Sequence, residues 1–177
     1  MKEKVFSFIR ESADGIVELE SLLTSVPALA PESGGQGELD KAIALEKWLR
    51  ANGVGDIVRM DAPDERVASG IRPNLVATIP GKDDSARLWV MTHLDVVPEG
   101  ERSNWKSDPW KVVVKDGRIY GRGVEDNQQG LVSSVFAGLA FLKQGLARAR
   151  TIKLLFVADE EVRSEERRVG KECRSRW

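Results

Sequence analysis

The sequence has 177 residues, 41% hydrophobic and 31% charged, a composition typical of a globular protein with one sizeable core. Its 27 basic and 28 acidic residues nearly cancel, so the charge balance gives no reason to expect nucleic acid as a partner. A single cysteine excludes an internal disulfide, and without a signal-like segment or a run of ~18 apolar residues we expect a soluble, cytoplasmic protein with no membrane partner.

The N-terminal part of the chain predicts two helices joined by a loop. Apolar residues recur at helical spacing over residues 2–23, which predicts one amphipathic helix with Gly15 as its weak point. Residues 26–37 contain two prolines and a Gly-Gly pair, but they lack the spacing of a phosphate-binding motif and are interpreted as a connection. A second helix is expected over residues 38–52, because Asn52-Gly53 is a typical helix end.

Three strand candidates follow these helices. Residues 57–60 give a weak strand prediction, and residues 75–79 give a stronger one because prolines bound the apolar run on both sides. Residues 87–92 form the next predicted strand, and the apolar run at 88–91 within it is typical of a fully buried strand. Helices followed by apolar strands indicate an α/β fold.

The second half of the chain predicts a hairpin and then a helix between two strands. Residues 112–115 and 118–120 flank Asp116-Gly117, which is a strong signal for a two-residue hairpin turn. A helix is predicted over residues 128–144 and a buried strand over residues 151–157. Together with the strand before the hairpin, these elements predict a right-handed crossover between parallel strands.

His93 and Asp95 come at the end of the strand predicted at 87–92, with one residue between them. Residues two apart in a strand point to the same side, so the two side chains can lie together at the carboxyl end of the strand. A carboxylate beside an imidazole can accept one ring N–H and leave the other nitrogen for a metal ion. A His-x-Asp pair alone is more often purely structural, so the metal interpretation depends on acidic residues elsewhere.

Acidic residues occupy comparable positions later in the chain. Glu160 and Glu161 follow the strand predicted at 151–157, and Asp126 precedes the helix that leads into that strand. Because ligands of open α/β sheets gather outside the carboxyl ends of the strands, these residues and His93 are expected at a common edge. One imidazole and several carboxylates suit Zn²⁺ or a similar divalent ion.

With these motifs the sequence resembles the N-terminal part of the M20 family of metallopeptidases and deacylases. That family includes carboxypeptidase, dipeptidase, aminoacylase, acetylornithine deacetylase and succinyl-diaminopimelate desuccinylase members. The segments that carry the resemblance lie between about residue 31 and residue 161 and are PESGGQGE, RPNLVATIPG, MTHLDVVPEG, WKSDPW, DGRIYGRGVEDNQQG and TIKLLFVADEE. The family commonly has lysine near position 128, where this chain has Gln128-Gln129.

The resemblance implies a fold and a role for each candidate residue. The fold would be an incomplete α/β catalytic domain of the zinc-dependent exopeptidase type, a mixed sheet flanked by helices, with the lid or dimerisation domain absent. His93 and Glu161 would each ligate one of two divalent metal ions, and Asp126 would bridge the two ions. Asp95 would support His93, and Glu160 would be the general base. The ions would be Zn²⁺, or else Co²⁺ or Mn²⁺.

The same resemblance implies the reaction and the partners. The enzyme would hydrolyse amide bonds in peptides or N-acyl amino acids, and the intact parent protein would be a homodimer. A non-catalytic binding or regulatory module on the same α/β fold is the alternative, although it would be expected to have lost metal ligands that are intact here. A nucleotide-binding domain is a third possibility, but the sequence lacks the glycine fingerprint that such a domain needs.

The resemblance ends after Val162. Residues 163–177 read RSEERRVGKECRSRW, a highly charged segment without apolar periodicity that resembles adapter-derived sequence appended to a truncated reading frame. A solvated helix end and a short nucleic-acid-binding arm are the alternatives. We interpret residues 1–162 as the N-terminal part of a catalytic domain and residues 163–177 as a non-native tail. Since the family takes a further acidic ligand and a second histidine from downstream, the chain, with its single histidine, is expected to be inactive alone.

Overall fold

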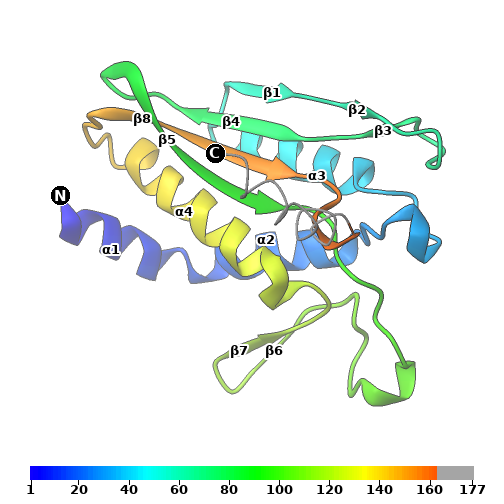
Figure 1. The fold of residues 1–177 in the computed structure, drawn as a ribbon. Coiled ribbons are helices and arrows are strands. Elements are labelled where there is room, and N and C mark those ends of the chain that lie inside the picture. The colour runs from blue at the N-terminus through cyan, green and yellow to red at the C-terminus, as the bar shows by residue number, and fades with distance from the viewer. Residues whose placement is uncertain (163–177) are drawn as a thin grey trace, which may run out of the picture.

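The computed structural model describes residues 1–162 and is built around a mixed four-stranded sheet; the charged segment 163–177 interpreted above as non-native lies outside the described residues. The strand order is β1-β4-β8-β5, with bounds Ile57–Arg59, Leu75–Ile79, Arg150–Val157 and Asp83–His93 respectively. β4 runs antiparallel to β1 and β8, whereas β8 runs parallel to β5. Figure 1 shows the helices gathered on one side of this sheet. The predicted α/β architecture, a mixed sheet flanked by helices, is confirmed.

Within residues 1–162, four α-helices lie on that side of the sheet, namely α1 (Lys2–Glu11), α2 (Ala13–Ser25), α3 (Leu39–Ala51) and α4 (Gln129–Lys143). The predictions over residues 38–52 and 128–144 are confirmed by α3 and α4. Shorter 3₁₀ turns cover Pro31–Ser33 and Arg102–Asn104. None of the helices within residues 1–162 has the length and hydrophobicity needed to cross a membrane.

The prediction of one helix over residues 2–23 with a weak point at Gly15 is wrong, because the chain breaks at Ser12 instead. The hydroxyl of Ser12 donates a 2.7 Å hydrogen bond to the carbonyl of Phe8, a local bond of the kind that bends or ends helices. Gly15 lies inside α2, where a Cβ atom would come within 3.3 Å of the Phe136 ring. The missing side chain therefore permits close packing of α2 on α4 and does not interrupt the helix.

The predicted strands at 57–60 and 75–79 are confirmed by β1 and β4. A two-stranded pair of β2 (Ala62–Pro63) and β3 (Ile71–Arg72), which the sequence analysis did not predict, lies between them in the chain. The predicted hairpin consists of β6 (Val113–Lys115) and β7 (Arg118–Tyr120). Its turn residues Asp116 and Gly117 both have positive φ, 52° and 71°, as a two-residue type I′ hairpin turn requires.

The core lies between the sheet and the helices. Its sheet residues include Leu75, Ala77, Leu154 and Phe156, and its helical residues include Leu19, Leu23, Leu45, Leu49, Leu131, Val135 and Leu139. The last five of these residues form the apolar faces of α3 and α4, the helices predicted over residues 38–52 and 128–144. Burial of these faces is what holds the helices on the sheet.

Phe156 is completely buried on β8, so its removal should leave a cavity in this core. We expect Phe156→Ala to lower the free energy of unfolding by about 3–5 kcal/mol, measured by urea denaturation followed by circular dichroism. Phe6→Ala is the matched control, because Phe6 is 44% exposed on α1 and its truncation should change stability by no more than about 0.5 kcal/mol. Equal losses in the two variants would contradict this description of the core.

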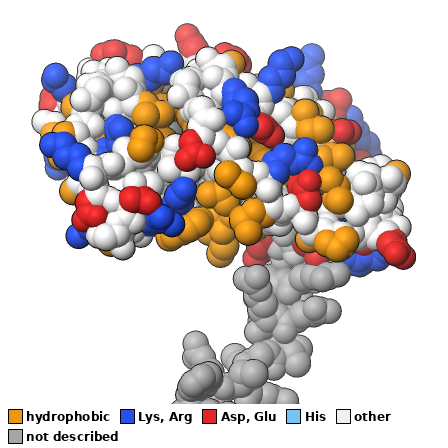
Figure 2. Space-filling view, turned by 90° about the horizontal axis from the view of Figure 1, so that it is seen from above, with side chains coloured by type: hydrophobic (Ala, Val, Ile, Leu, Met, Phe, Trp, Pro, Cys, Tyr) orange, Lys and Arg blue, Asp and Glu red, His pale blue; other side chains and the backbone are white. Residues whose placement is uncertain are grey.

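β5 is an edge strand of the sheet, and no element in the described part of the chain covers one of its faces. The prediction that residues 88–91 are fully buried is wrong, since Leu88, Trp89 and Met91 are 56%, 50% and 59% exposed. The reason is tertiary, because within residues 1–162 β5 has a neighbouring strand on one side only and the helices cover one face of the sheet. Figure 2 looks onto the sheet side of the molecule and shows hydrophobic side chains gathered among charged ones. Contiguous apolar surface of this kind is unusual on a free-standing monomer.

β5, α4 and β8 form the predicted crossover unit and bring the candidate site together. The two strands are parallel neighbours, and His93 at the end of β5 is in register with Val157 at the end of β8. Between β7 and α4 the chain forms a π-helical turn over Val124–Gln128, in which Asp126 departs from helical geometry. Gly123 precedes this turn with φ 80°, and a Cβ there would meet the Val96 side chain at 2.5 Å. The chain therefore follows a tight path at Gly123 that a residue with a side chain could not adopt without displacing Val96.

Candidate metal centre

His93 presents one ring nitrogen to the other candidate ligands. It is the last residue of β5 and only 6% exposed. Its Nδ1 lies 3.0 Å from the main-chain oxygen of Asp95, which can only accept, so Nδ1 carries a proton. Its Nε2 is directed at Asp126, whose Oδ1 is 3.1 Å away. Burial would lower the pKa of His93, but Asp95 and Asp126 outweigh it and raise this pKa to about 9, so a metal ion at Nε2 would replace a proton.

Asp95 lies just beyond the strand, and its side chain is completely buried. One carboxylate oxygen accepts the main-chain N–H of Glu161 at 2.8 Å, and the other lies 3.5 Å from Nδ1 of His93. The Asp95 carboxylate was expected to accept the ring N–H of His93, but the main-chain carbonyl of Asp95 accepts it instead. The expectation assumed that side chains two residues apart point to the same side, and this no longer holds at Asp95 because β5 ends at His93. Burial acts to raise the pKa of Asp95, but His93 and the N–H groups of Glu161 and Glu160 lower it.

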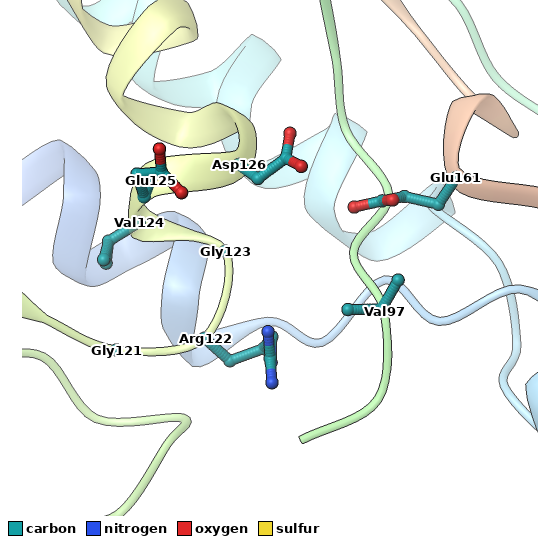
Figure 3. Close-up of a pocket in the computed structure, with 8 residues that line it drawn as sticks. All are labelled: Val97, Gly121, Arg122, Gly123, Val124, Glu125, Asp126 and Glu161. Atoms are coloured by element: carbon teal, nitrogen blue, oxygen red, sulfur yellow. The ribbon is translucent and has the colours of Figure 1, made fainter. Parts of the chain in front are cut away.

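Asp126 and Glu161 complete a group of three possible ligands. Asp126 comes from the turn before α4, and Glu161 from the segment after β8. One ring nitrogen of His93 and one carboxylate oxygen of each acidic residue all lie within 4.8 Å of one another. Figure 3 shows the two carboxylates facing each other across a pocket. Burial raises the pKa of Glu161, and the negative charge of Asp126 raises it further. A bound cation would offset this repulsion between the two carboxylates. The donor set therefore fits a divalent ion.

Glu160 lies close to this group but outside it. Its Oε2 is 4.0 Å from Nε2 of His93, and its side chain is 44% exposed. The structure thus brings all five candidate residues to the edge where β5 and β8 end, as the sequence analysis expected. The distinct roles of the five remain predictions.

A pocket of about 360 Å³ opens beside the three possible ligands, lined by Val97, Gly121, Arg122, Gly123, Val124, Glu125, Asp126 and Glu161. Arg122 is a cation on the wall of this pocket that the sequence analysis did not single out. Its guanidinium lies 5.3 Å from the centre of the Trp105 ring and donates to the carbonyl of Glu99 at 3.3 Å. The Gly121-Arg122-Gly123 sequence was the signal that could have identified this arginine. Glycines on both sides permit a tight turn from which the arginine side chain projects.

A cluster of buried charges adjoins the site and was also not predicted. Arg72 forms ion pairs with Glu38, which is fully buried, and with Asp159, whose oxygen is 3.1 Å away. Lys41, one helical turn before Leu45 on α3, is 1% exposed. The signal in the sequence was a lysine at helical spacing on an otherwise apolar face.

Comparisons with known proteins agree with this arrangement. Residues 89–172 match the model of a family described as peptidase family M20/M25/M40. An uncharacterized metallohydrolase of Methanococcus maripaludis is 38% identical over 156 residues, which cover 84% of this chain and 36% of that protein. A succinyl-diaminopimelate desuccinylase of Xanthomonas oryzae pv. oryzae is 40% identical over 74 residues, covering 42% of this chain and 20% of that protein. The chain therefore spans about a third or less of the length of these relatives.

Solved structures give the same fold. The dipeptidase Dug1p of Saccharomyces cerevisiae has a TM-score of 0.76 at 23% identity, covering 96% of this chain and 37% of that one. Human carnosine dipeptidase 1 has a TM-score of 0.74 at 22% identity, covering 88% of this chain and 34% of that one. At such identities the likeness shows the fold alone, and the fold agrees with the expected catalytic-domain architecture.

Proposed function

The chain belongs to peptidase family M20/M25/M40, and on that premise we propose that it forms the metal-binding part of a hydrolase that cleaves amide bonds in peptides or N-acyl amino acids. The observation that carries the proposal is the convergence of His93, Asp126 and Glu161 within 4.8 Å at the carboxyl ends of two parallel strands. The relatives described as a metallohydrolase and a desuccinylase support hydrolysis as the general reaction. The chain spans 36% and 20% of the length of these relatives, so hydrolysis is proposed for a longer protein that contains residues 1–162.

We infer that two divalent ions bind at this site. His93 would ligate one ion, Glu161 the other, and Asp126 both, since a carboxylate has two oxygens. Zn²⁺ suits this mixture of imidazole and carboxylate, with Co²⁺ or Mn²⁺ as alternatives. When bound, such ions would polarise the scissile carbonyl and lower the pKa of water at the site.

The chain's own residues would then divide the remaining work. Glu160 is near His93 but outside the group of three, and its partly exposed carboxylate is accessible to water. It would take a proton from the attacking water and pass it to the amine as the C–N bond breaks, so that acid and amine leave as separate products. Asp95 would keep the His93 ring oriented, through its carbonyl at Nδ1 and its buried carboxylate beside it.

Arg122 supports the proposed class of substrate. Peptides and N-acyl amino acids carry a free carboxylate, and a guanidinium on the wall of the pocket is a suitable partner for such a group. The intact group of His93, Asp126 and Glu161 gives no particular support to a metal-free binding module on the same fold.

Metal removal tests this function directly. Exhaustive treatment of the longer protein with a chelator should abolish hydrolysis, and Zn²⁺, Co²⁺ or Mn²⁺ should restore it, because imidazole and carboxylate ligands bind all three. The measurement is release of free amino acid from a panel of dipeptides and N-acyl amino acids. Full activity in protein shown by elemental analysis to be free of metal would refute the mechanism.

A further inference from the structure

The short segment that carries Glu160 and Glu161 contains a residue in the left-handed region of backbone space. Asp159 has φ 65°, a conformation that residues with a side chain rarely adopt, although aspartate tolerates it better than most. Such a conformation persists only where surrounding contacts hold it. Asp159 lies between the end of β8 and the two glutamates, so the contacts that hold it also set the direction in which the glutamates leave the sheet.

Arg72, the last residue of β3, binds the side chain of Asp159. Its Nη2 lies 3.1 Å from Oδ1 of Asp159. The guanidinium is itself fixed, because its Nε donates to Glu38, the residue before α3, at 2.6 Å. Arg72 and Glu38 are both buried, and the planar fork of an arginine can bind two carboxylates at once. Arg72 therefore connects the start of α3 with the segment after β8.

Asn74 binds the main chain of the same segment. Its side-chain oxygen accepts the N–H of Ala158 at 3.1 Å, and its side-chain nitrogen donates to the carbonyl of Met60 at 2.9 Å. Only one orientation of the amide satisfies both bonds, so the oxygen is held toward Ala158. Arg72 and Asn74, two positions apart, thus contact Asp159 and Ala158, which are adjacent in the chain.

A third contact reaches the segment from beyond the end of β5. Oδ2 of Asp95 accepts the main-chain N–H of Glu161 at 2.8 Å. Both ends of the segment are therefore bound to other parts of the chain. The Arg72-Pro73-Asn74 sequence begins within one of the segments that carry the family resemblance, but the function proposed above gives it no role.

We propose that Arg72 and Asn74 are positioning residues for the metal centre, because together they fix the main chain from which the two glutamates project. They act through Asp159 and Ala158 and not on the metal ion itself. The inference rests on the metal centre proposed above. Loss of either contact should let the backbone of Asp159 leave the left-handed region and carry Glu161 out of the group of three ligands.

Hydrogen exchange of the 177-residue chain without metal tests the contacts themselves. Asn74→Ala should speed exchange of the Ala158 amide about 5- to 10-fold, and Asn74→Asp, which keeps an acceptor oxygen, should restore most of the protection. The amide of Leu154 inside β8 should exchange as in wild type. The measurement is mass spectrometry with fragmentation that resolves single amides. Unchanged exchange at Ala158, or an equal increase at Leu154, would contradict the local contact.

Zn²⁺ affinity of the same chain, measured in competition with a colorimetric chelator of known affinity, tests the consequence. Arg72→Met should weaken binding about 10- to 100-fold. Arg59→Met removes an exposed arginine of β1, is the matched control and should bind as wild type. His93→Ala removes a proposed ligand and sets the background. Wild-type affinity in a folded Arg72→Met would overturn the role of Arg72.

A double variant separates positioning from stability, because Arg72→Met also leaves the buried carboxylate of Glu38 without its partner. Adding Glu38→Gln removes that charge and should raise the thermal transition toward that of wild type while the Zn²⁺ affinity stays low. Recovery of the affinity together with the stability would show that Arg72 is structural only and would overturn its proposed role.

Asn74→Ala removes no charge and decides the case in which the Arg72 variants do not fold. It should also weaken Zn²⁺ binding, and Asn74→Asp should recover most of the loss. Wild-type affinity in Asn74→Ala, in a chain that binds Zn²⁺ normally, would refute only the positioning role. A wild-type chain that binds Zn²⁺ no better than His93→Ala would instead refute the metal centre of the proposed function.

Discussion

Replacing Glu160 with glutamine in the longer protein should lower turnover about 10²- to 10⁴-fold and leave the metal content near that of wild type. The side chain lies 4.0 Å from Nε2 of His93, outside the three residues whose ligand atoms converge. An amide of the same size cannot accept a proton from water, so proton transfer is lost while the ligands remain. The measurements are kcat with a dipeptide substrate and metal content by elemental analysis of the same sample.

The Asp126→Asn variant is the matched comparison, because it should lose a metal ligand where Glu160→Gln loses a general base. The Asp126 carboxylate is one of the three converging groups, and an amide in its place would offer one neutral oxygen where a bridge needs a full charge. This variant should therefore lose metal together with activity. If Glu160→Gln strips the metal and Asp126→Asn retains it, the two roles are reversed.

The 177-residue chain by itself should hydrolyse none of these substrates at a measurable rate. A protein-bound metal ion of this kind needs about three protein ligands. In the proposed two-ion arrangement, His93 and Asp126 would hold one ion and Glu161 and Asp126 the other. Two ligands for each ion would hold both metals loosely. The exposed apolar side chains on β5 should also make this chain poorly soluble.

The test compares two proteins under one assay. Residues 1–177, and a form in which residues 163–177 are replaced by the genomic sequence that follows residue 162, are incubated with dipeptides and N-acyl amino acids in the presence of Zn²⁺ or Co²⁺. Circular dichroism of the shorter protein establishes that it is folded before its activity is judged. Comparable turnover by the two proteins would contradict both the ligand count and the interpretation of the C-terminal segment.

Much of the fold could be predicted from the sequence because its signals are local. The apolar spacing over α4 and the Asp116-Gly117 turn act within a few residues, and both predictions are confirmed. The placement of His93 and Glu161 after two apolar strands was enough to predict a common edge, because parallel neighbours end on the same side of a sheet.

Only the tertiary structure decided the features that depend on residues distant in the chain. The exposure of Trp89 follows from the edge position of β5, which no property of the strand itself specifies. The approach of the Asp95 carbonyl to His93 follows from where β5 ends. The charge on Arg72 is tolerated in the interior because folding brings Glu38, 34 positions earlier in the sequence, into hydrogen-bond contact with its guanidinium. Hydrophobic periodicity identifies which face of an element is buried, but the partner of a buried charge is chosen by packing between elements.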